Sequence, residues 1–305
     1  MVTLAPGMGY IDLHFMGRAR AIAAVAIHGA GGVVLIDPGP TSTLPVLRAA
    51  LGRSGIQMSD VTAVLLTHIH LDHAGAVGTL VREQPRLRVY VHEVGAPHMA
   101  DPAKLIASAT RLYGDAMESL WGEFAPVPPH AMVLLRGGER LDVGGRRLEV
   151  AYTPGHASHH VSFFSHETGV AFVGDTAGVT VTPGGYVLPP TPPPDIDLER
   201  WGQSLSAIDA WHPETLLLTH FGPSGNTASH LAELRDHMEL VAGIARRSLD
   251  LEGDDGVREQ WFVEQLRREV RRHLGDADAA AYETSARFDL NWRGLARYWR
   301  TRASA

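Results

Sequence analysis

The chain contains 305 residues, of which 45% are hydrophobic and 20% are charged. This balance is typical of a soluble globular protein and excludes a largely disordered one. The net charge of -7 argues against a surface that is built throughout for nucleic acid. Because there is no cysteine, disulfides, thiolate metal ligands and a cysteine nucleophile are excluded, whereas 17 histidines stand out.

No targeting or membrane segment is recognisable in the sequence. The first 20 residues lack a basic stretch followed by a long apolar one, so we expect no signal peptide and a cytoplasmic protein. No run approaches the roughly 18 consecutive apolar residues of a membrane-spanning helix. We therefore expect no membrane association.

Short apolar runs that end at turn residues predict strands along most of the chain. In chain order, the expected strands are 20–27, 33–36, 61–67, 87–91, 132–135, 147–152, 161–164, 170–173 and 215–219. The run 61–67 is apolar almost throughout, which is typical of a strand that is covered on both faces. The Pro-rich segment 183–197 is expected to be an irregular loop.

Helices are predicted where apolar residues recur at every third or fourth position. They are expected at 42–51, 105–121, 198–211, 227–249 and 257–274, with a last one around Trp292, Leu295 and Trp299. Asp101 and Pro102 form an expected helix start within a helical insertion at about 95–130. We expect a mixed α/β catalytic domain over 1–225 and a helical C-terminal extension over 226–305 that packs on it.

The strongest local signal is the segment 68–73, HIHLDH, which directly follows the apolar run 61–67. It contains the candidate ligands His68, His70, Asp72 and His73. Imidazole and carboxylate groups are the usual ligands of zinc and related divalent ions. A merely solvent-exposed histidine cluster would not explain why an apolar strand leads straight into it.

Three further candidate ligands also follow predicted strands. They are His156 after the strand 147–152, Asp175 after 170–173 and His220 after 215–219. Each lies at the C-terminal end of an apolar strand, in a turn that contains or borders glycine, where the chain can approach a ligand closely. Four strand ends that carry His or Asp are hard to explain without a metal.

Together these motifs resemble those of the metallo-beta-lactamase superfamily. They are IDPG at 36–39, HxHxDH at 68–73, TPGH at 153–156, GD at 174–175 and TH at 219–220. The resemblance covers residues from about 20 to 222. It implies an α/β fold, namely an αββα sandwich, here with a helical insertion and a helical C-terminal extension.

The resemblance also implies a ligand set for two divalent metal ions. The first ion would be bound by His68, His70 and His156, the second by Asp72, His73 and His220, with Asp175 between them. Asp72 and Asp175 would then also be the catalytic residues. Zinc is the expected metal, with iron and manganese as alternatives.

By the same resemblance, we expect a metal-dependent hydrolase of a small-molecule carboxylic ester, lactone or thioester that acts through a metal-bridging hydroxide. The His and Asp set resembles that of glyoxalase II-type thioesterases and acyl-homoserine lactonases. A β-lactamase is less favoured because those enzymes usually lack an aspartate at the position of Asp175. A phosphodiesterase with the same centre and a mononuclear iron enzyme similar to persulfide dioxygenases stay open as alternatives.

The expected partner is the small-molecule substrate, with no nucleic acid, and a homodimer stays an open expectation. Asp37 is expected either to orient a metal-bound histidine or to form only a turn. Four aromatic residues are candidate walls of a substrate pocket, although helix packing is the simpler interpretation. They are Tyr113, Trp121, Trp292 and Trp299. The Pro-rich loop is a candidate rim of that pocket.

Overall fold

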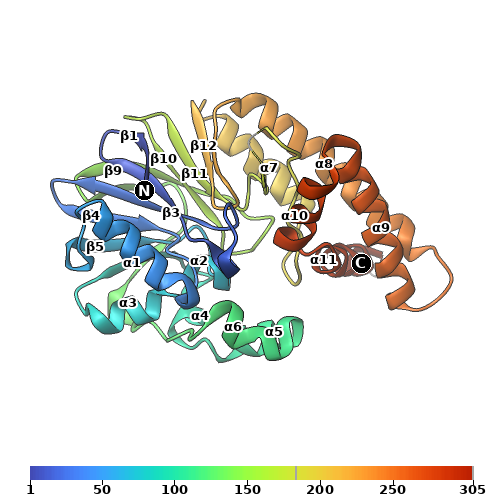
Figure 1. Cartoon of the computed structure of the whole chain (residues 1–305), viewed down its shortest axis with the longest axis horizontal. Coiled ribbons are helices and arrows are strands. Elements are labelled where there is room, and N and C mark those ends of the chain that lie inside the picture. Colours follow the sequence, from blue (N-terminus) through green and yellow to red (C-terminus); the bar gives the residue numbers. More distant parts are fainter. Residues whose placement is uncertain (183, 304–305) are drawn as a thin grey trace.

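Two β-sheets lie face to face in the computed structural model, which describes residues 1–182 and 184–303 (Figure 1). The strands of the first sheet lie side by side in their order along the chain. They are β1 (Val2–Ala5), β2 (Met8–Asp12), β3 (Ala23–Gly29), β4 (Gly32–Ile36), β5 (Val61–Leu65), β6 (Arg88–His92) and β7 (Met132–Leu135). Pairing is antiparallel from β1 to β4 and parallel from β4 to β7, so each parallel step needs a crossover, which helices supply.

The second sheet has the strand order β13-β12-β11-β10-β9-β8. Its strands are β8 (Arg140–Val143), β9 (Arg146–Tyr152), β10 (Val161–Ser165), β11 (Val170–Gly174), β12 (Thr215–Leu218) and β13 (Gly222–Ser224). Its neighbours are antiparallel except β11 and β12, which are parallel. The helix α7 (Leu198–Asp209) makes the crossover between these two strands.

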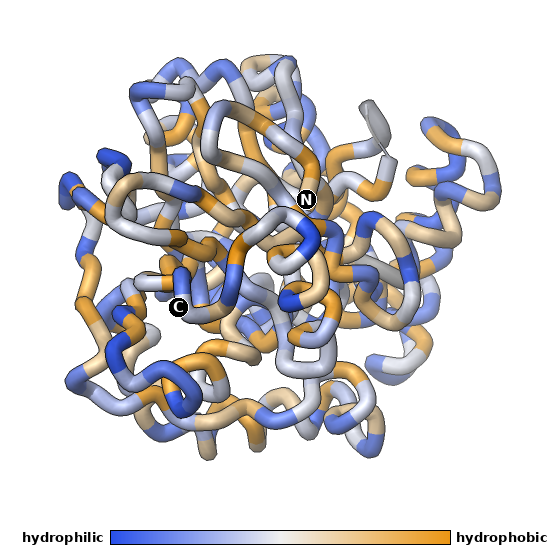
Figure 2. Tube along the Cα trace, turned by 60° about the vertical axis from the view of Figure 1, so that its left-hand side comes forward, coloured by the Kyte–Doolittle hydropathy of each residue, from blue (hydrophilic) through white to orange (hydrophobic). Residues whose placement is uncertain are grey.

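Alternation along the strands gives each sheet two apolar faces. In β3, Val25 and Ile27 belong to the cluster between the two sheets, whereas Ala24 and Ala26 belong to the cluster under the outer helices. This division follows because successive side chains of a strand point to opposite faces. In Figure 2, hydrophobic stretches accordingly recur within the body of the fold, and the hydrophilic ones gather at its turns and ends.

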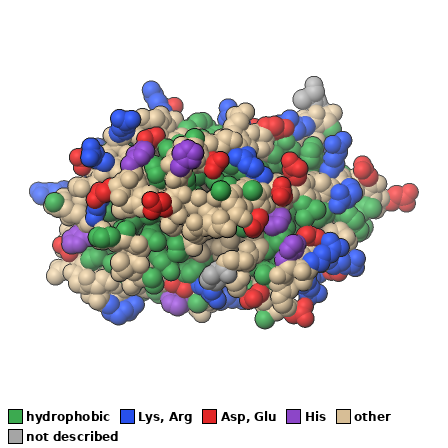
Figure 3. All heavy atoms as spheres, turned by 90° about the horizontal axis from the view of Figure 1, so that it is seen from above, with side chains coloured by type: hydrophobic (Ala, Val, Ile, Leu, Met, Phe, Trp, Pro, Cys, Tyr) green, Lys and Arg blue, Asp and Glu red, His purple; other side chains and the backbone are tan. Residues whose placement is uncertain are grey.

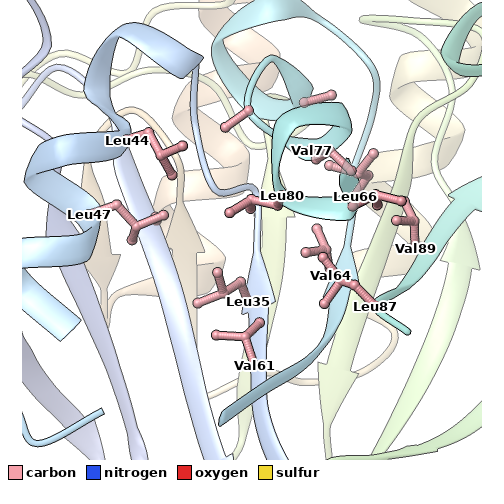
Figure 4. Packing of buried hydrophobic residues seen from close by; sticks show 14 of the residues in the cluster. Leu35, Leu44, Leu47, Val61, Val64, Leu66, Val77, Leu80, Leu87 and Val89 are labelled. Atoms are coloured by element: carbon pink, nitrogen blue, oxygen red, sulfur yellow. The ribbon is translucent and has the colours of Figure 1, made fainter. Parts of the chain in front are cut away.

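Helices α1 (Leu44–Arg53) and α3 (Val77–Glu83) cover the outer face of the first sheet. Figure 4 shows Leu44 and Leu80 directed at strand residues such as Leu35 and Val64, and all four are at most 5% exposed. Full burial of one such side chain contributes about 1.5–3 kcal/mol. The first sheet is therefore fixed from both sides.

The outer face of the second sheet is covered by α7 and by the C-terminal helices (Figure 1). These are α8 (Thr227–Leu249), α9 (Asp255–His273), α10 (Asp276–Ala286) and α11 (Phe288–Ala303). One continuous cluster joins Leu216 of β12 to Leu231 of α8, Phe262 of α9 and Leu295 of α11. The layers therefore run helix, sheet, sheet, helix, which confirms the predicted αββα sandwich with helical C-terminal region.

The insertion after β6 forms α4 (Ala96–Ala100), α5 (Ala103–Tyr113) and α6 (Met117–Trp121). The helical pattern over 105–121 predicts no break, but the structure interrupts it with a short 3-10 helix, Gly114–Ala116. Gly114 has φ 52°, a conformation that glycine adopts without the steric cost of a side chain. The expected cap is displaced by one residue: Pro102 rather than Asp101 is the N-cap of α5, and Oδ1 of Asp101 accepts a hydrogen bond from the Ala103 N–H at 3.2 Å.

The other predicted strands and helices are present with ends shifted by up to three residues, apart from the last helix, of which only three residues were named. The sequence did not predict β1, β2, β8, β13, α3, α10 or the short α2 (Leu71–Ala74). The remaining 3-10 helices are Phe15–Gly17, Thr41–Thr43, Met58–Asp60 and Pro129–Ala131. Residues 184–197 form no helix or strand apart from one isolated bridge at Leu188, as expected, whereas Pro183 and residues 304–305 lie outside the described part.

The surface carries charges of both signs. Basic and acidic side chains are interspersed over the face seen in Figure 3, and the chain has a net charge of -7. Across the described residues, every helix is either too short or too polar to traverse a lipid bilayer.

Candidate metal centre

The structure brings all seven predicted ligands together. They follow the C-terminal ends of β5, β9, β11 and β12, so both sheets contribute: His68, His70, Asp72, His73, His156, Asp175 and His220. Only His70 and Asp72 are partly exposed, and the other five are buried. Aspartate is seldom buried unless it is paired or binds a metal, so the buried carboxylate of Asp175 requires a compensating positive charge.

Three ring nitrogens converge in the first group. Nδ1 of His70 lies 2.9 Å from Nε2 of His68 and 3.0 Å from Nε2 of His156. Nitrogens that bind one tetrahedral zinc ion at about 2.0–2.1 Å would lie about 3.3 Å apart. These nitrogens are therefore only slightly closer together than they would be around a bound zinc ion.

A second group forms around His73. Nε2 of His220 lies 3.2 Å from Oδ2 of Asp72, and Nε2 of His73 lies 3.9 Å from the same oxygen. Asp175 reaches both groups, because its Oδ2 lies 3.4 Å from Nε2 of His156 and its Oδ1 lies 3.2 Å from Nε2 of His73. One carboxylate is thus shared between two sets of candidate ligands.

Two buried atoms of this cluster lack a hydrogen bond. Nε2 of His73 and Oδ1 of Asp175 are 3.2 Å apart, but neither makes a hydrogen bond of normal geometry with any described residue. A buried polar atom without a partner costs about 1–3 kcal/mol. A cation between the two atoms would satisfy both, so the residues present fit a metal ion.

Backbone carbonyls orient two of the candidate ligands. The Pro190 carbonyl accepts a hydrogen bond from Nδ1 of His156 at 2.9 Å, and the Ala21 carbonyl accepts one from Nδ1 of His220 at 2.6 Å. Because a carbonyl can only accept, Nδ1 carries the proton in each ring. In the neutral form of each ring, Nε2 then has the lone pair, which is directed at the cluster.

Asp37 holds His73 in the same way. Its Oδ2 lies 2.8 Å from Nδ1 of His73 and 2.6 Å from the Thr67 hydroxyl, and its Oδ1 accepts a hydrogen bond from the Thr67 N–H at 2.8 Å. The Thr219 hydroxyl adds a longer contact to Oδ2, at 3.2 Å. Asp37 therefore orients a candidate ligand, the first of the two roles expected for it.

The environment separates neutral from charged groups. Burial lowers the pKa of His70 to about 4, and neighbouring His156 adds to this, so the His70 ring is neutral near pH 7. Burial raises the pKa of Asp72, but His73 and the hydrogen bond from His220 outweigh burial and bring it to about 2. Burial alone would lower the pKa of His73, yet Asp175 and Asp72 raise it well above its usual value. The carboxylates thus favour positive charge at this point.

A cavity of about 150 Å³ opens onto the cluster. It reaches both groups, since His70, Asp72, His156, Asp175 and His220 line it. Its walls come from α5 and α6, from the loop 190–194 and from residues 286–291 around the start of α11. A second cavity of about 330 Å³ shares Asp72, His220, Tyr113, Trp121 and Arg287 with the first and continues under Phe15, Ile22 and Leu120.

The aromatic wall candidates divide into two pairs. Tyr113 and Trp121 line both cavities. Trp292 and Trp299 line neither one: their indole N–H groups donate to Ser248 and to the Ala242 carbonyl within the C-terminal helices. Helix packing accounts for the second pair.

Sequence reasoning missed two cavity residues of the C-terminal region, Arg287 and Asn291. They are four positions apart, a spacing that places side chains on one helix face, but Arg287 precedes α11 and no motif marks either residue. Thr67 was missed as well. It lies at the end of the expected strand 61–67, and nothing in that apolar pattern indicates that its hydroxyl contacts Asp37. The expected rim is present, because Pro190 and three prolines at 192–194 line the first cavity.

Comparison with known proteins agrees with this geometry. A model of the metallo-beta-lactamase superfamily matches residues 17–220. The metallo-beta-lactamase fold-containing protein ST1585 of Sulfurisphaera tokodaii is 31% identical over 162 residues, which are 52% of this chain and 60% of that protein. A hydroxyacylglutathione hydrolase of Aeromonas hydrophila is 30% identical over 143 residues, 47% of this chain and 41% of that enzyme. The matches thus span less than two thirds of these relatives.

Solved structures resemble the whole chain in fold. The metallo-beta-lactamase family protein TTHA1429 of Thermus thermophilus has a TM-score of 0.72 at 23% identity, over 99% of this chain and 95% of that one. The ST1585 crystal structure has a TM-score of 0.67 at 23% identity, over 95% and 98%. The likeness in fold and the family match over most of the chain lead to one conclusion: the chain belongs to the metallo-beta-lactamase superfamily.

Proposed function

We propose that the chain is a hydrolase that binds two divalent metal ions, with zinc as the expected metal. It would cleave a carboxylic ester, lactone or thioester of a small molecule. The first ion would be held by His68, His70 and His156 and the second by Asp72, His73 and His220. The position of Asp175 carries the proposal, since one of its oxygens faces each set. A single-ion site would leave the second set, with its buried His73 and His220, without a role.

When bound, two such ions supply an activated water at neutral pH and positive charge for the developing oxyanion. The chain contributes orientation and proton handling. Asp72 is ionised at neutral pH and lines both cavities, so its carboxylate can accept a hydrogen bond from the attacking water. The backbone at Asp175 is also held in place, because its N–H donates a hydrogen bond to Nε2 of His160 at 3.3 Å.

The cavity favours a small, largely neutral substrate. Its walls are mostly apolar, and Arg287 is the one Lys or Arg among the described residues that line it. The Arg287 guanidinium is bound by both carboxylate oxygens of Asp289, at 2.9 and 2.7 Å. Some relatives are named hydroxyacylglutathione hydrolases, which supports a thioester, but we propose an acyl compound simpler than glutathione.

The test is the metal content of freshly purified protein, followed by a panel of esters, lactones, thioesters and a phosphodiester. We expect two zinc ions per chain and hydrolysis of acyl substrates. Asp175→Asn should reduce kcat/KM at least 1000-fold, whereas His28→Asn, which changes an exposed histidine, should not. About one iron per chain with oxygen consumption, or phosphodiester cleavage alone, would overturn the proposal.

A further inference from the structure

One peptide unit links the C-terminal helices to the first group of candidate ligands. Its carbonyl, that of Pro190, accepts the hydrogen bond from Nδ1 of His156 at 2.9 Å. Its N–H, that of Thr191, donates to Oδ1 of Asn291 in α11 at 2.8 Å. The peptide bond is trans and planar, so its carbonyl and its N–H point in opposite directions. Asn291 and His156 thus lie at the two ends of one rigid, hydrogen-bonded unit.

The Asn291 amide has only one orientation that makes this bond. A backbone N–H can only donate, so the amide must present its oxygen to Thr191 and its Nδ2 to the other side. Nδ2 is buried there, and it has no hydrogen-bond partner among the described residues. A buried donor without a partner is unfavourable, so the bond to Thr191 is formed at the expense of the other half of the amide.

Further contacts hold the same loop on α11. The Thr191 hydroxyl donates to the Asn291 backbone carbonyl at 3.2 Å, and Nε of Arg297 donates to the Pro194 carbonyl at 3.3 Å. Gly294 lets the loop and the helix approach closely, since a Cβ at this position would lie 2.0 Å from the Thr191 carbonyl oxygen. Thr191 and Asn291 are each 1% exposed, so bulk water does not compete for the bonds between them.

Two effects transmit the Asn291 contact to His156. A planar peptide cannot turn at one end without turning at the other, so an acceptor at the Thr191 N–H also fixes the direction of the Pro190 carbonyl. Hydrogen bonds in series also polarise one another, which makes that carbonyl a stronger acceptor. A metal-binding histidine whose other ring nitrogen donates to such an acceptor is held in one tautomer and one orientation, and it is a more basic ligand.

We propose that Asn291 is a positioning residue for the first metal ion and that it acts on His156 through the peptide between Pro190 and Thr191. This inference rests on the proposed function, which assigns His156 to that ion. The second group of ligands is oriented separately, by the Ala21 carbonyl and by Asp37. The effect of Asn291 is therefore confined to the first ion.

The test is a zinc titration of the metal-free protein against a chelating dye. Asn291→Leu removes the acceptor of the Thr191 N–H and should raise the dissociation constant of the first ion about tenfold, the lower end of the range for a lost partner behind a ligand. The dissociation constant of the second ion should stay within threefold of the wild-type value. Asn291→Ala makes the same prediction without a bulky side chain, and Asn291→Asp, which keeps an oxygen at Oδ1, should restore wild-type affinity to within threefold.

Thr191→Val is the matched control. It removes the hydroxyl contact between the same two residues but keeps the peptide N–H, so both dissociation constants should stay within threefold of the wild-type values. A general loosening of the contact between the loop and α11 would instead weaken zinc binding in this variant as much as in Asn291→Leu.

NMR of protein that contains ¹⁵N-labelled histidine gives a readout at the ring itself. The Nδ1 proton of His156, assigned by its loss in His156→Gln, identifies the first ion as the one whose binding shifts this signal. In zinc-loaded Asn291→Leu the proton should resonate further upfield and exchange faster with solvent than in the wild type, whereas Thr191→Val should leave it unchanged. The remaining histidine signals show whether each variant is folded.

Wild-type affinity and an unchanged His156 signal in Asn291→Leu and Asn291→Ala would overturn the inference. Equal losses of affinity in Asn291→Leu and Thr191→Val would overturn it as well. Both results leave the proposed function standing. A wild-type protein that binds no zinc would overturn the proposed function and this inference with it.

Discussion

Replacing Asp37 by Asn should selectively weaken binding of the second of the two proposed metal ions. The variant keeps the shape of the side chain, and asparagine tolerates the positive φ of 47° at this position. Oδ1 of Asp37 accepts from a backbone N–H, so the oxygen of the new amide must remain there. The new NH2 group then occupies the place of Oδ2, 2.8 Å from Nδ1 of His73.

This exchange changes which nitrogen of the His73 ring carries the proton. An NH2 donor requires an acceptor at Nδ1, so the proton must move to Nε2, the atom that faces Asp175. The lost hydrogen bond to a charged group is equivalent to about 1.5–3 kcal/mol. Since about 1.4 kcal/mol corresponds to a factor of ten, the second ion should bind about 10–100-fold more weakly.

Competition with a chelating dye measures both ions in one zinc titration. We expect the first dissociation constant to stay within threefold of the wild-type value in Asp37→Asn and the second to rise. Thr219→Val is the matched control, because it removes the 3.2 Å contact to Asp37 and leaves the His73 proton in place. Equal affinity of both ions in the Asp37 variant and the wild type would refute the argument about the ring proton.

Three other perturbations test the fold. Leu80→Ala should lower the free energy of unfolding by about 2–5 kcal/mol in urea titrations, because Leu80 is fully buried; the same change at Leu134, which is 55% exposed, should cost far less. Removing the metal with a chelator should lower the melting temperature, with about 2.7 kcal/mol regained at zinc 100-fold above its dissociation constant. Burial lowers the pKa of His230, so below about pH 6.5 the unfolded chain binds a proton that the folded one excludes. The metal-free protein should therefore lose stability as the pH falls from about 6.5, and His230→Gln should lose less; equal slopes in the two proteins would contradict this.

The candidate ligands could be predicted from the sequence because each follows an apolar strand. The C-terminal ends of β9, β11 and β12 lie at one edge of the second sheet, because β11 and β12 are parallel and β9 is separated from β11 by two antiparallel steps. A turn next to a buried strand is placed as firmly as the strand itself. The distances between the two groups could not be predicted, since Asp175 reaches both only through the packing of one sheet on the other.

The wall of the cavity was much less predictable. Asn291 lies in a helix whose pattern reports only which face is buried, and its partner Thr191 is distant in sequence and lies in an irregular loop. The break at Gly114 was missed because the apolar spacing continues across it. Strand β8 was missed because its exposed Arg140 and Asp142 obscure the apolar pattern.

The cavity walls contain segments that carry no candidate ligand, and they are attached to the fold in different ways. The insertion meets the rest of the chain partly through hydrogen bonds, in which Ser42 and Thr41 donate to the backbone carbonyls of Leu120 and Glu123. Its residues Met99, Ala109 and Trp121 also belong to the hydrophobic cluster that covers the first sheet, whereas α11 belongs to the cluster that covers the second sheet. In an engineering experiment, exchange of either segment therefore has to retain its buried apolar side chains, and the two segments can be varied separately because they pack on different sheets.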